Sequence, residues 1–520
     1  MARNGMVATS QPLAAVAGLR VLMDGGNAVD AAVATAAVLN VVEPGSTGVG
    51  GDVFALVWSS EEKRVSALNS SGRASRHASL AELRDQGLAS IPNESAYAVT
   101  VPGAVGGWEA ILQCHGTMKL SELLKPAIDY AVGGYPVSEV ISSQWAVGAN
   151  RLRLHPSGDE LLVDGRAPEA GEVVCLPELA RTLKTIAEGG ADAFYNGTLA
   201  RRIAEYVQQR GGWLSIEDMA DHQPTWEEPI HTSYRGLDCW QCPPNSQGIH
   251  VLMALNLAEG IDLQAMGFQS TDTYHHLIEC MRLAFADGWY HVTDPSKMRV
   301  SSQDLLSKRY ADQRRSLISE RQAIASPVTG LPSPGSDTVY LTCVDSQGNA
   351  CSFINSVFTG FGTGLVVPGT GIALQSRGTS FSLDSRHPNA LEPNKRPFHT
   401  LIPGMVTRDG ELWLSYGVMG AVQQAQGHFQ VLVNMIDFGL DPQAALDAPR
   451  FSVRPDEVIA IEDTAPDTVA SDLIEKGHNA MVCPPGTALF GGGQIIERDP
   501  KTGVLRGGSE PRSDGCAVGW

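Results

Sequence analysis

The sequence predicts an α/β or α+β sandwich that is divided at residue 337. Residues before that point show mainly the periodicity of helices, whereas residues after it show the alternation of strands. Between the two parts, residues 326–336 (SPVTGLPSPGS) form a stretch rich in proline and glycine, the clearest break in composition along the chain. A helix-rich part followed by a sheet-forming part is typical of helices layered on sheets.

The chain begins with two predicted helices. The first covers residues 11–23 and ends at a glycine pair, with apolar side chains at helical spacing at Leu13, Val16, Leu19 and Leu22. The second begins at Asn27, and the acidic Asp30 three residues later has the spacing of a helix cap. Residues 31–42 are so uniformly apolar that this helix must be buried on nearly all sides.

A glycine turn and a strand follow the second helix. The turn is residues 48–52 (GVGGD), and the strand is residues 53–58, with bulky side chains on one face at Phe54, Leu56 and Trp58. A dinucleotide-binding fingerprint needs the opposite order, with its glycines after a strand and before a helix. Nucleotide binding is therefore not predicted here, and the chain contains no GxxxxGK(S/T), HExxH or GxSxG motif.

The middle of the chain is predicted to be a layer of helices, and the part after residue 337 to begin with a β-hairpin. The expected helices lie at residues 120–133, 176–189, 198–210 and 271–288. The hairpin consists of strands at residues 339–344 and 350–354, which the segment DSQGN joins.

Bulk composition narrows the class of protein. With 520 residues, 43% hydrophobic and 18% charged, the chain can bury a large core. A net charge of −19 would repel nucleic acid and anionic lipid, and no apolar run resembles a signal peptide or a membrane span. The nine scattered cysteines fit reduced thiols, and Cys239 and Cys242 lack the second pair that a metal site needs. We therefore expect a cytoplasmic protein without a nucleic-acid, membrane or metal partner.

The most informative point is the peptide bond between Asp337 and Thr338, where the proline-rich stretch meets a strand. If that bond is cut, Thr338 becomes an N-terminus with a hydroxyl and a free α-amine, a nucleophile and its base on one residue. Such an amine titrates near ~8, so part of it is neutral at cellular pH, and neither metal nor cofactor is needed. By itself, the local pattern also fits a loop that enters a β-hairpin.

Seven motifs in order along the chain resemble those of the gamma-glutamyltranspeptidase family of N-terminal-nucleophile hydrolases. They are residues 25–32 (GGNAVDAA), 48–51 (GVGG), 101–103 (VPG), 243–248 (PPNSQG), Thr338 with 345–349 (DSQGN), 393–397 (PNKRP) and 447–451 (DAPRF). The resemblance covers nearly the whole chain. It implies a four-layer αββα sandwich and one inactive precursor that cleaves itself between Asp337 and Thr338.

The resemblance also implies the products of that cleavage. Residues 1–337 would form a large, helix-rich segment, and residues 338–520 a small, sheet-rich catalytic segment. The two fragments would remain one intertwined unit, and a homodimer of that unit is left open. By family position, Ser356 supports the nucleophile, and the backbone N–H groups of Gly420 and Ala421 form the oxyanion hole. Transpeptidases usually carry two glycines there, and the methyl group of Ala421 narrows the available backbone conformations.

The positions that would hold the substrate depart from the transpeptidase pattern. In transpeptidases an arginine, an asparagine and an aspartate grip the γ-glutamyl group; here those positions are Ser71, Phe358 and Ser380. Charge-assisted bonds to that group would be lost, which puts γ-glutamyl recognition in doubt.

Other residues near the expected site could replace those contacts. His399-Thr400 stands where transpeptidases have paired serines, and the lid segment, residues 382–393, is short. Arg73 and Arg377 are candidate cations for an anionic substrate, although a structural role fits either arginine equally well.

This pattern resembles the acylase or amidase branch of the family, with cephalosporin-acylase-like and oxamate-amidohydrolase-like proteins. It predicts an autoprocessed amidohydrolase or γ-glutamyltransferase that forms an acyl-Thr338 intermediate from a γ-glutamyl or similar acidic small amide. Oxamate or cephalosporin side-chain hydrolysis is the alternative within this class. An unprocessed binding or scaffold protein is the alternative of another class.

Overall fold

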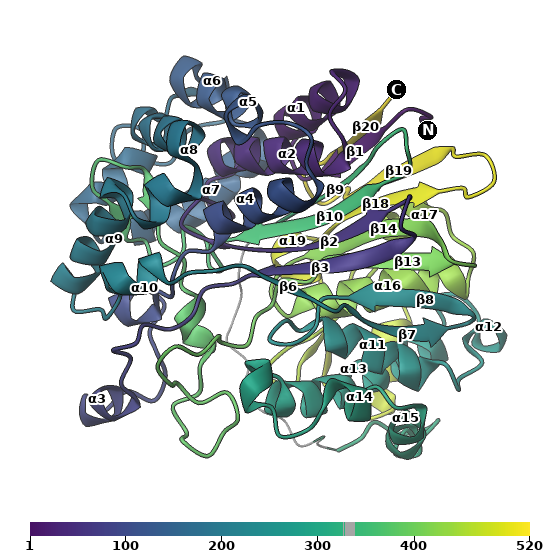
Figure 1. The fold of residues 1–520 in the computed structure, drawn as a ribbon. Helices are drawn as coiled ribbons and strands as arrows, with labels where there is room; N and C mark the ends of the chain where they lie inside the picture. Colours follow the sequence, from purple (N-terminus) through teal and green to yellow (C-terminus); the bar gives the residue numbers. More distant parts are fainter. Residues whose placement is uncertain (326, 328–337) are drawn as a thin grey trace.

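The fold consists of four layers in the order helix, sheet, sheet and helix (Figure 1). The computed structural model describes residues 1–325, 327 and 338–520. The mixed α+β architecture predicted from the sequence is confirmed. Among the described residues, no helix is long and apolar enough to cross a bilayer.

The first sheet has seven strands, and its central strands carry the predicted hairpin. In spatial order they are β20 (Cys516–Gly519), β1 (Met6–Thr9), β9 (Val339–Val344), β10 (Ala350–Ser356), β2 (Asp52–Ser59), β3 (Arg64–Ser70) and β6 (Thr225–Glu227). All neighbours pair antiparallel. Strands from before and after residue 337 are therefore neighbours within one sheet, with β9 and β10 lying between β1 and β2.

The second sheet has six strands and is also built from both parts of the chain. In order they are β19 (Leu505–Ser509), β18 (Gly492–Arg498), β14 (Glu411–Met419), β13 (Gly404–Arg408), β8 (Leu237–Gln241) and β7 (Ile230–Tyr234). Because each sheet contains strands from before and after residue 337, a cut between residues 337 and 338 would leave the strand hydrogen bonds of both sheets in place.

Helices cover the outer face of each sheet (Figure 1). On the first sheet lie α1 (Pro12–Met23), α2 (Ala28–Val42) and α4 (Ala104–His115), and outside them pack α6 (Lys125–Gly133), α8 (Pro177–Tyr195) and α9 (Thr198–Gln209). On the second lie α11 (Gly248–Ala258) and α16 (Gln423–Ile436), with α13 (Thr271–His291) packed against α11. Most predicted helices are confirmed, but the one expected at residues 120–133 is split at Leu124 into α5 (Leu120–Leu123) and α6.

Side chains alternate between two cores along the central strands of the first sheet. Val339, Leu341 and Cys343 of β9 pack on the helical layer, whereas Tyr340 and Val344 face the second sheet. In β2 the predicted apolar face is confirmed, since its bulky side chains Phe54, Leu56 and Trp58 all lie between the sheets. Even-numbered residues of β2, β9 and β10 thus point into the space between the sheets.

The first helices and the hairpin are joined by polar caps. Asn27 and Asp30 form the predicted capping box at the start of α2. Asp345, in the turn between β9 and β10, accepts a hydrogen bond from the backbone N–H of Ala28 (3.1 Å) and others from Gln347 and Asn349. The DSQGN turn is therefore fixed to the N-terminus of α2, where a carboxylate is favoured.

Candidate active site

Three polar residues meet at one end of the central strands, facing the second sheet. Ser356, the last residue of β10, is the register partner of Asp52, the first residue of β2. Asn355 pairs with Val339, which places Thr338 beside Ser356 on the neighbouring strand. The Thr338 hydroxyl, fully buried, donates a hydrogen bond to the Ser356 hydroxyl oxygen at 3.1 Å. Asp337, the residue before it, lies outside the described residues.

The Ser356 hydroxyl is held by the backbone that follows it. Its oxygen also accepts a hydrogen bond from the N–H of Phe358 (2.8 Å), whose φ of 81° turns the chain sharply. On the other side, a Cβ built on Gly51 would collide with the Ser356 carbonyl oxygen, so the GVGG turn needs glycine at this point. The Gly51 carbonyl in turn accepts hydrogen bonds from the N–H groups of Gly103 and Ala104. Two of the sequence motifs thus support the strand end that carries Ser356.

The second sheet brings the end of β14 towards the same place. Thr342 of β9 is hydrogen-bonded to Ser415 of β14, and the Tyr340 ring packs against Gly417. Continuing this alternation by two residues brings Thr338 level with Met419, the last residue of β14, which directly precedes Gly420 and Ala421. This register predicts that the expected oxyanion residues lie across the sheet interface from Thr338.

The Gly420-Ala421 turn has an unusual backbone. Gly420 has a φ of 124° and Ala421 a φ of 49°, in the left-handed region that L-residues adopt rarely. Outside the helices and strands of the described chain, no hydrogen bond uses either N–H as its donor. Ala421 thus adopts a conformation better suited to glycine, and both N–H groups remain available to a ligand.

Two buried side chains that the sequence interpretation did not single out hold this turn. The amide of Gln247 donates to the carbonyl oxygens of both Ala421 and Thr400, each at 2.8 Å. Arg450 donates to the carbonyl oxygens of Phe490 and Gly491, and Gly491 packs against Gly420. Both residues belong to motifs noted in the sequence, PPNSQG and DAPRF. Their place in these motifs was the sequence feature that could have identified them as site residues.

Arg377 is a fully buried cation beside these residues. Its Nη1 donates to the Thr400 hydroxyl oxygen (2.9 Å), and its guanidinium lies 4.1 Å from the centre of the Phe358 ring. Its Nε and Nη2 have no hydrogen-bond partner among the described residues. Burial lowers the pKa of Arg377 to about 9, and nearby Asp52 opposes that shift. Buried, unpaired guanidinium donors are costly unless an anion meets them.

Asp52 and His399 form a second buried polar pair, and only His399 was predicted at the site. His399 Nε2 lies 3.1 Å from Asp52 Oδ2, while Nδ1 accepts the N–H of Leu401, so the neutral ring donates to the carboxylate. The Gly72 N–H donates to Asp52 Oδ1. Burial raises the pKa of Asp52 to about 6, although Arg377 acts to lower it, and burial holds the pKa of His399 well below its usual range. An aspartate opening an otherwise apolar strand was the signal in the sequence.

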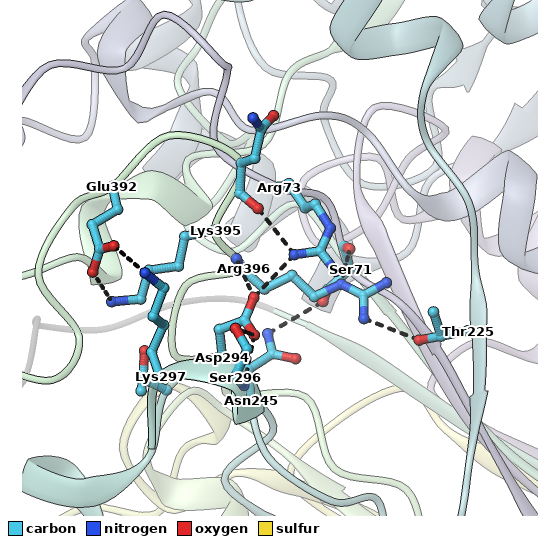
Figure 2. Close-up of polar contacts among 12 residues, drawn as sticks. Ser71, Arg73, Thr225, Asn245, Asp294, Ser296, Lys297, Glu392, Lys395 and Arg396 are labelled. Carbon is cyan, nitrogen blue, oxygen red and sulfur yellow. Dashed lines mark hydrogen bonds and ion pairs between the residues drawn. The ribbon is translucent and has the colours of Figure 1, made fainter. Parts of the chain in front are cut away.

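Arg73 occupies a different environment from Arg377. Its guanidinium is 45% exposed and binds Asp294 Oδ2 (3.0 Å) and the Asn394 carbonyl oxygen (2.9 Å). Figure 2 shows Asp294 also accepting the backbone N–H of Arg396, whose side chain reaches the carbonyl of Ser71 and the hydroxyl of Thr225. Arg73 and Arg396 line a pocket of about 260 Å³. The charge of Arg73 is therefore already paired within the chain.

Two of the three residues at the positions that transpeptidases use for the γ-glutamyl group have side-chain partners within the chain. The Ser71 hydroxyl donates to Asn69 Oδ1 (2.7 Å), whereas at Ser380 it is the backbone carbonyl that accepts from the Asn389 side chain (2.6 Å). The Phe358 ring lies under the Arg377 guanidinium. The structure therefore brings Thr338, Ser356, Arg377, His399 and Thr400 together and leaves Arg73 in its own pocket.

Comparison with known proteins identifies the family. The gamma-glutamyltranspeptidase family model matches residues 14–520. A glutathione hydrolase-like YwrD proenzyme of Bacillus subtilis is 39% identical over 99% of this chain and 98% of that protein. An oxamate amidohydrolase proenzyme of Klebsiella pneumoniae is 34% identical over 99% of this chain and 98% of that protein.

A solved structure agrees with this assignment. The crystal structure of a cephalosporin acylase from Bacillus halodurans superimposes with a TM-score of 0.94 at 47% identity, covering 100% of this chain and 96% of that chain. The chain is an enzyme that belongs to the gamma-glutamyltranspeptidase family.

Proposed function

We propose that the chain is a precursor that cuts itself before Thr338 and then acts as an N-terminal-threonine amidohydrolase. The observation that carries this proposal is the position of the buried Thr338 hydroxyl. Thr338 directly precedes β9, and its hydroxyl lies 3.1 Å from that of Ser356, the last residue of β10. A threonine hydroxyl is a weak nucleophile without a base, and cleavage would create that base as the α-amine of the same residue. The proenzyme names of the relatives support a precursor of this kind.

The reaction follows from this geometry. The Thr338 oxygen attacks the substrate carbonyl carbon while its proton passes to the Thr338 α-amine. The C–N bond of the substrate amide then breaks, and the leaving amine takes up that proton from the α-ammonium. The N–H groups of Gly420 and Ala421 stabilise the oxyanion, a contribution of ~3 kcal/mol per donor in comparable sites. The product of this half-reaction is an acyl-Thr338 ester. Water then releases the acid, or an amine accepts the acyl group.

Arg377 supports a substrate whose acyl group carries a carboxylate. Its two unpaired donors are buried, fixed by Thr400 and Phe358, and near the strand end that carries Ser356. A carboxylate can accept two parallel hydrogen bonds from a guanidinium, which satisfies both donors at once. Arg377 is therefore the stronger candidate than Arg73, which already binds Asp294.

Small acidic amides are the substrate class that fits this arrangement. Oxamate, named for the Klebsiella relative, carries a carboxylate next to its amide. A γ-glutamyl group carries an ammonium as well, and of the residues at the positions that grip it in transpeptidases, the Ser71 hydroxyl already binds Asn69 and the Phe358 ring already contacts Arg377. Hydrolysis of oxamate-like or cephalosporin side-chain amides is the second candidate function within the class, and an unprocessed binding protein is the candidate of another class.

Intact mass spectrometry of the purified protein beside a Thr338→Ala variant tests the proposal. We expect two fragments in the wild type, with Thr338 as the first residue of the smaller one, and a single uncut chain in the variant. N-terminal sequencing of the smaller fragment identifies the bond. An uncut wild-type chain without amidase activity would refute autoprocessing and favour the non-catalytic protein.

A further inference from the structure

Asp52 has no role in the proposed reaction, yet it lies at the centre of the site. It is the register partner of Ser356, and both side chains point between the two sheets. The carboxylate is fully buried and is held by the Gly72 N–H at 3.0 Å and by His399 Nε2 at 3.1 Å. A buried carboxylate beside a catalytic hydroxyl affects any charge that enters the site.

The dipeptide His399-Thr400 links Asp52 to Arg377. His399 binds the carboxylate of Asp52, and the next residue, Thr400, binds the guanidinium of Arg377. The two charges are close enough to shift each other's pKa, but among the described residues Arg377 makes no ion pair within 4.0 Å. Asp52 therefore affects the charge of Arg377 electrostatically, without a direct hydrogen bond, and does not occupy the Nε and Nη2 donors.

The charged and titratable groups around Asp52 come from several elements. Arg377 lies after β12 (Ile372–Ala373), Arg396 and His399 belong to the segment before β13, and Tyr195 ends α8. Of the two arginines, Arg396 is already committed to Thr225, Glu227 and the Ser71 carbonyl. Of these two arginines, Arg377 is the one with unpaired hydrogen-bond donors among the described residues.

We propose that Asp52 is a specificity-determining residue whose ionised carboxylate repels the substrate carboxylate from Arg377, so that acidic amides bind best when Asp52 is protonated. The inference rests on the proposed function, because it needs a substrate carboxylate at Arg377. When Asp52 is neutral, the Arg377 charge faces the substrate alone. When Asp52 is ionised, its carboxylate and the substrate carboxylate are two buried anions beside the single guanidinium of Arg377, and they repel each other.

The direction of the pH dependence follows from linkage. Burial raises the pKa of Asp52 to about 6, and a bound substrate carboxylate raises it further. Binding of an acidic amide therefore takes up a proton, and its KM is low below pH 6 and increases as pH rises through that value. Arg377, with a pKa lowered to about 9, stays charged over this range. A further shift of one pKa unit in the complex corresponds to a change of about ten-fold in KM.

The test uses matched amides on the processed enzyme. The substrates are p-nitroanilides of oxalic, succinic and glutaric acids, each paired with the analogue in which CONH2 replaces the free COO−. Titration of the Thr338 α-amine changes kcat/KM for both members of a pair alike, so the acid-to-neutral ratio isolates Asp52. We expect this ratio to fall about ten-fold between about pH 5 and about pH 8.

An Asp52→Asn variant provides the second measurement. It should hold the acid-to-neutral ratio at its high, low-pH value throughout, because the neutral amide cannot repel the substrate. A flat ratio in the wild-type enzyme, with both amides hydrolysed, would overturn the role of Asp52 and leave the proposed function standing. Absence of hydrolysis of every amide would overturn the proposed function, and the role of Asp52 with it.

Discussion

Replacement of Arg377 by methionine tests the assignment of the substrate carboxylate most directly. Methionine keeps an unbranched side chain of moderate length and removes the charge and all donors. In the wild type, two buried donors, Nε and Nη2, are open to a ligand. Hydrogen bonds to charged groups contribute about 1.5 to 3 kcal/mol each, so the pair contributes about 3 to 6 kcal/mol. Because about 1.4 kcal/mol corresponds to a ten-fold change, kcat/KM for an acidic amide should fall by about 100-fold to 10,000-fold.

The stability of this variant separates recognition from folding. Arg377 is fully buried, and within the described part of the chain its side chain forms a hydrogen bond only through Nη1, so its charge is poorly compensated. Replacing such a cation by an apolar side chain is often neutral or stabilising. We expect a Tm equal to or slightly above that of the wild type, measured by differential scanning calorimetry on the processed enzyme.

The assay compares each acidic p-nitroanilide with its neutral carbamoyl analogue. Arg377→Met should lose activity on the acid and keep it on the neutral amide. Arg181→Ala, which removes a side chain 63% exposed on α8, serves as the control and should change neither. An equal loss on both amides, or a large drop in Tm, would refute a carboxylate-binding role and make Arg377 a structural residue.

Three further substitutions test the remaining parts of the site. Ser356→Ala removes the acceptor of the Thr338 and Phe358 hydrogen bonds, so kcat should fall by about ten-fold to 100-fold. Unchanged activity would contradict the supporting role of Ser356. Ala421→Gly relieves a φ of 49°, and chemical denaturation should reveal a gain of about 1 kcal/mol with activity retained; a loss of activity would show that the methyl group is needed. Gly51→Ala should block self-cleavage, seen as a single uncut band on a denaturing gel, because its Cβ would collide with the Ser356 carbonyl oxygen. Gly133→Ala is the control and should be cleaved normally, because no described atom lies within 4 Å of the added Cβ.

Local elements could be predicted from the sequence because their causes are local. The capping box of α2 depends on Asn27 and Asp30, three residues apart, and the alternation in β2 on neighbours within one strand. The split at Leu124 was missed because Lys125-Pro126 begins a new helix there, and the apolar spacing continues across the break. Thr338 was marked by the change in composition before its strand, and Ser356 by its position in the family pattern.

The two arginines show where sequence reasoning ends. Arg73 and Arg377 were equal candidates, because the identity of a side chain does not reveal its burial or its partner. Asp294, 221 positions away, neutralises Arg73, while Arg377 is enclosed with no partner for two of its donors among the residues that the structure describes. Asp52 was not singled out at all, because His399, 347 positions away, completes its environment.

The sequence by itself determined most of the helices, the central hairpin and the resemblance to a family, and it predicted Thr338 as the nucleophile, since each depends on short spacings or on motifs in order. Only the tertiary structure decided which of the two arginines has unpaired donors among the described residues, and which carboxylate lies beside it. Those properties arise when strands from both parts of the chain pair in two sheets, and the register of such distant pairs is not encoded in any local pattern.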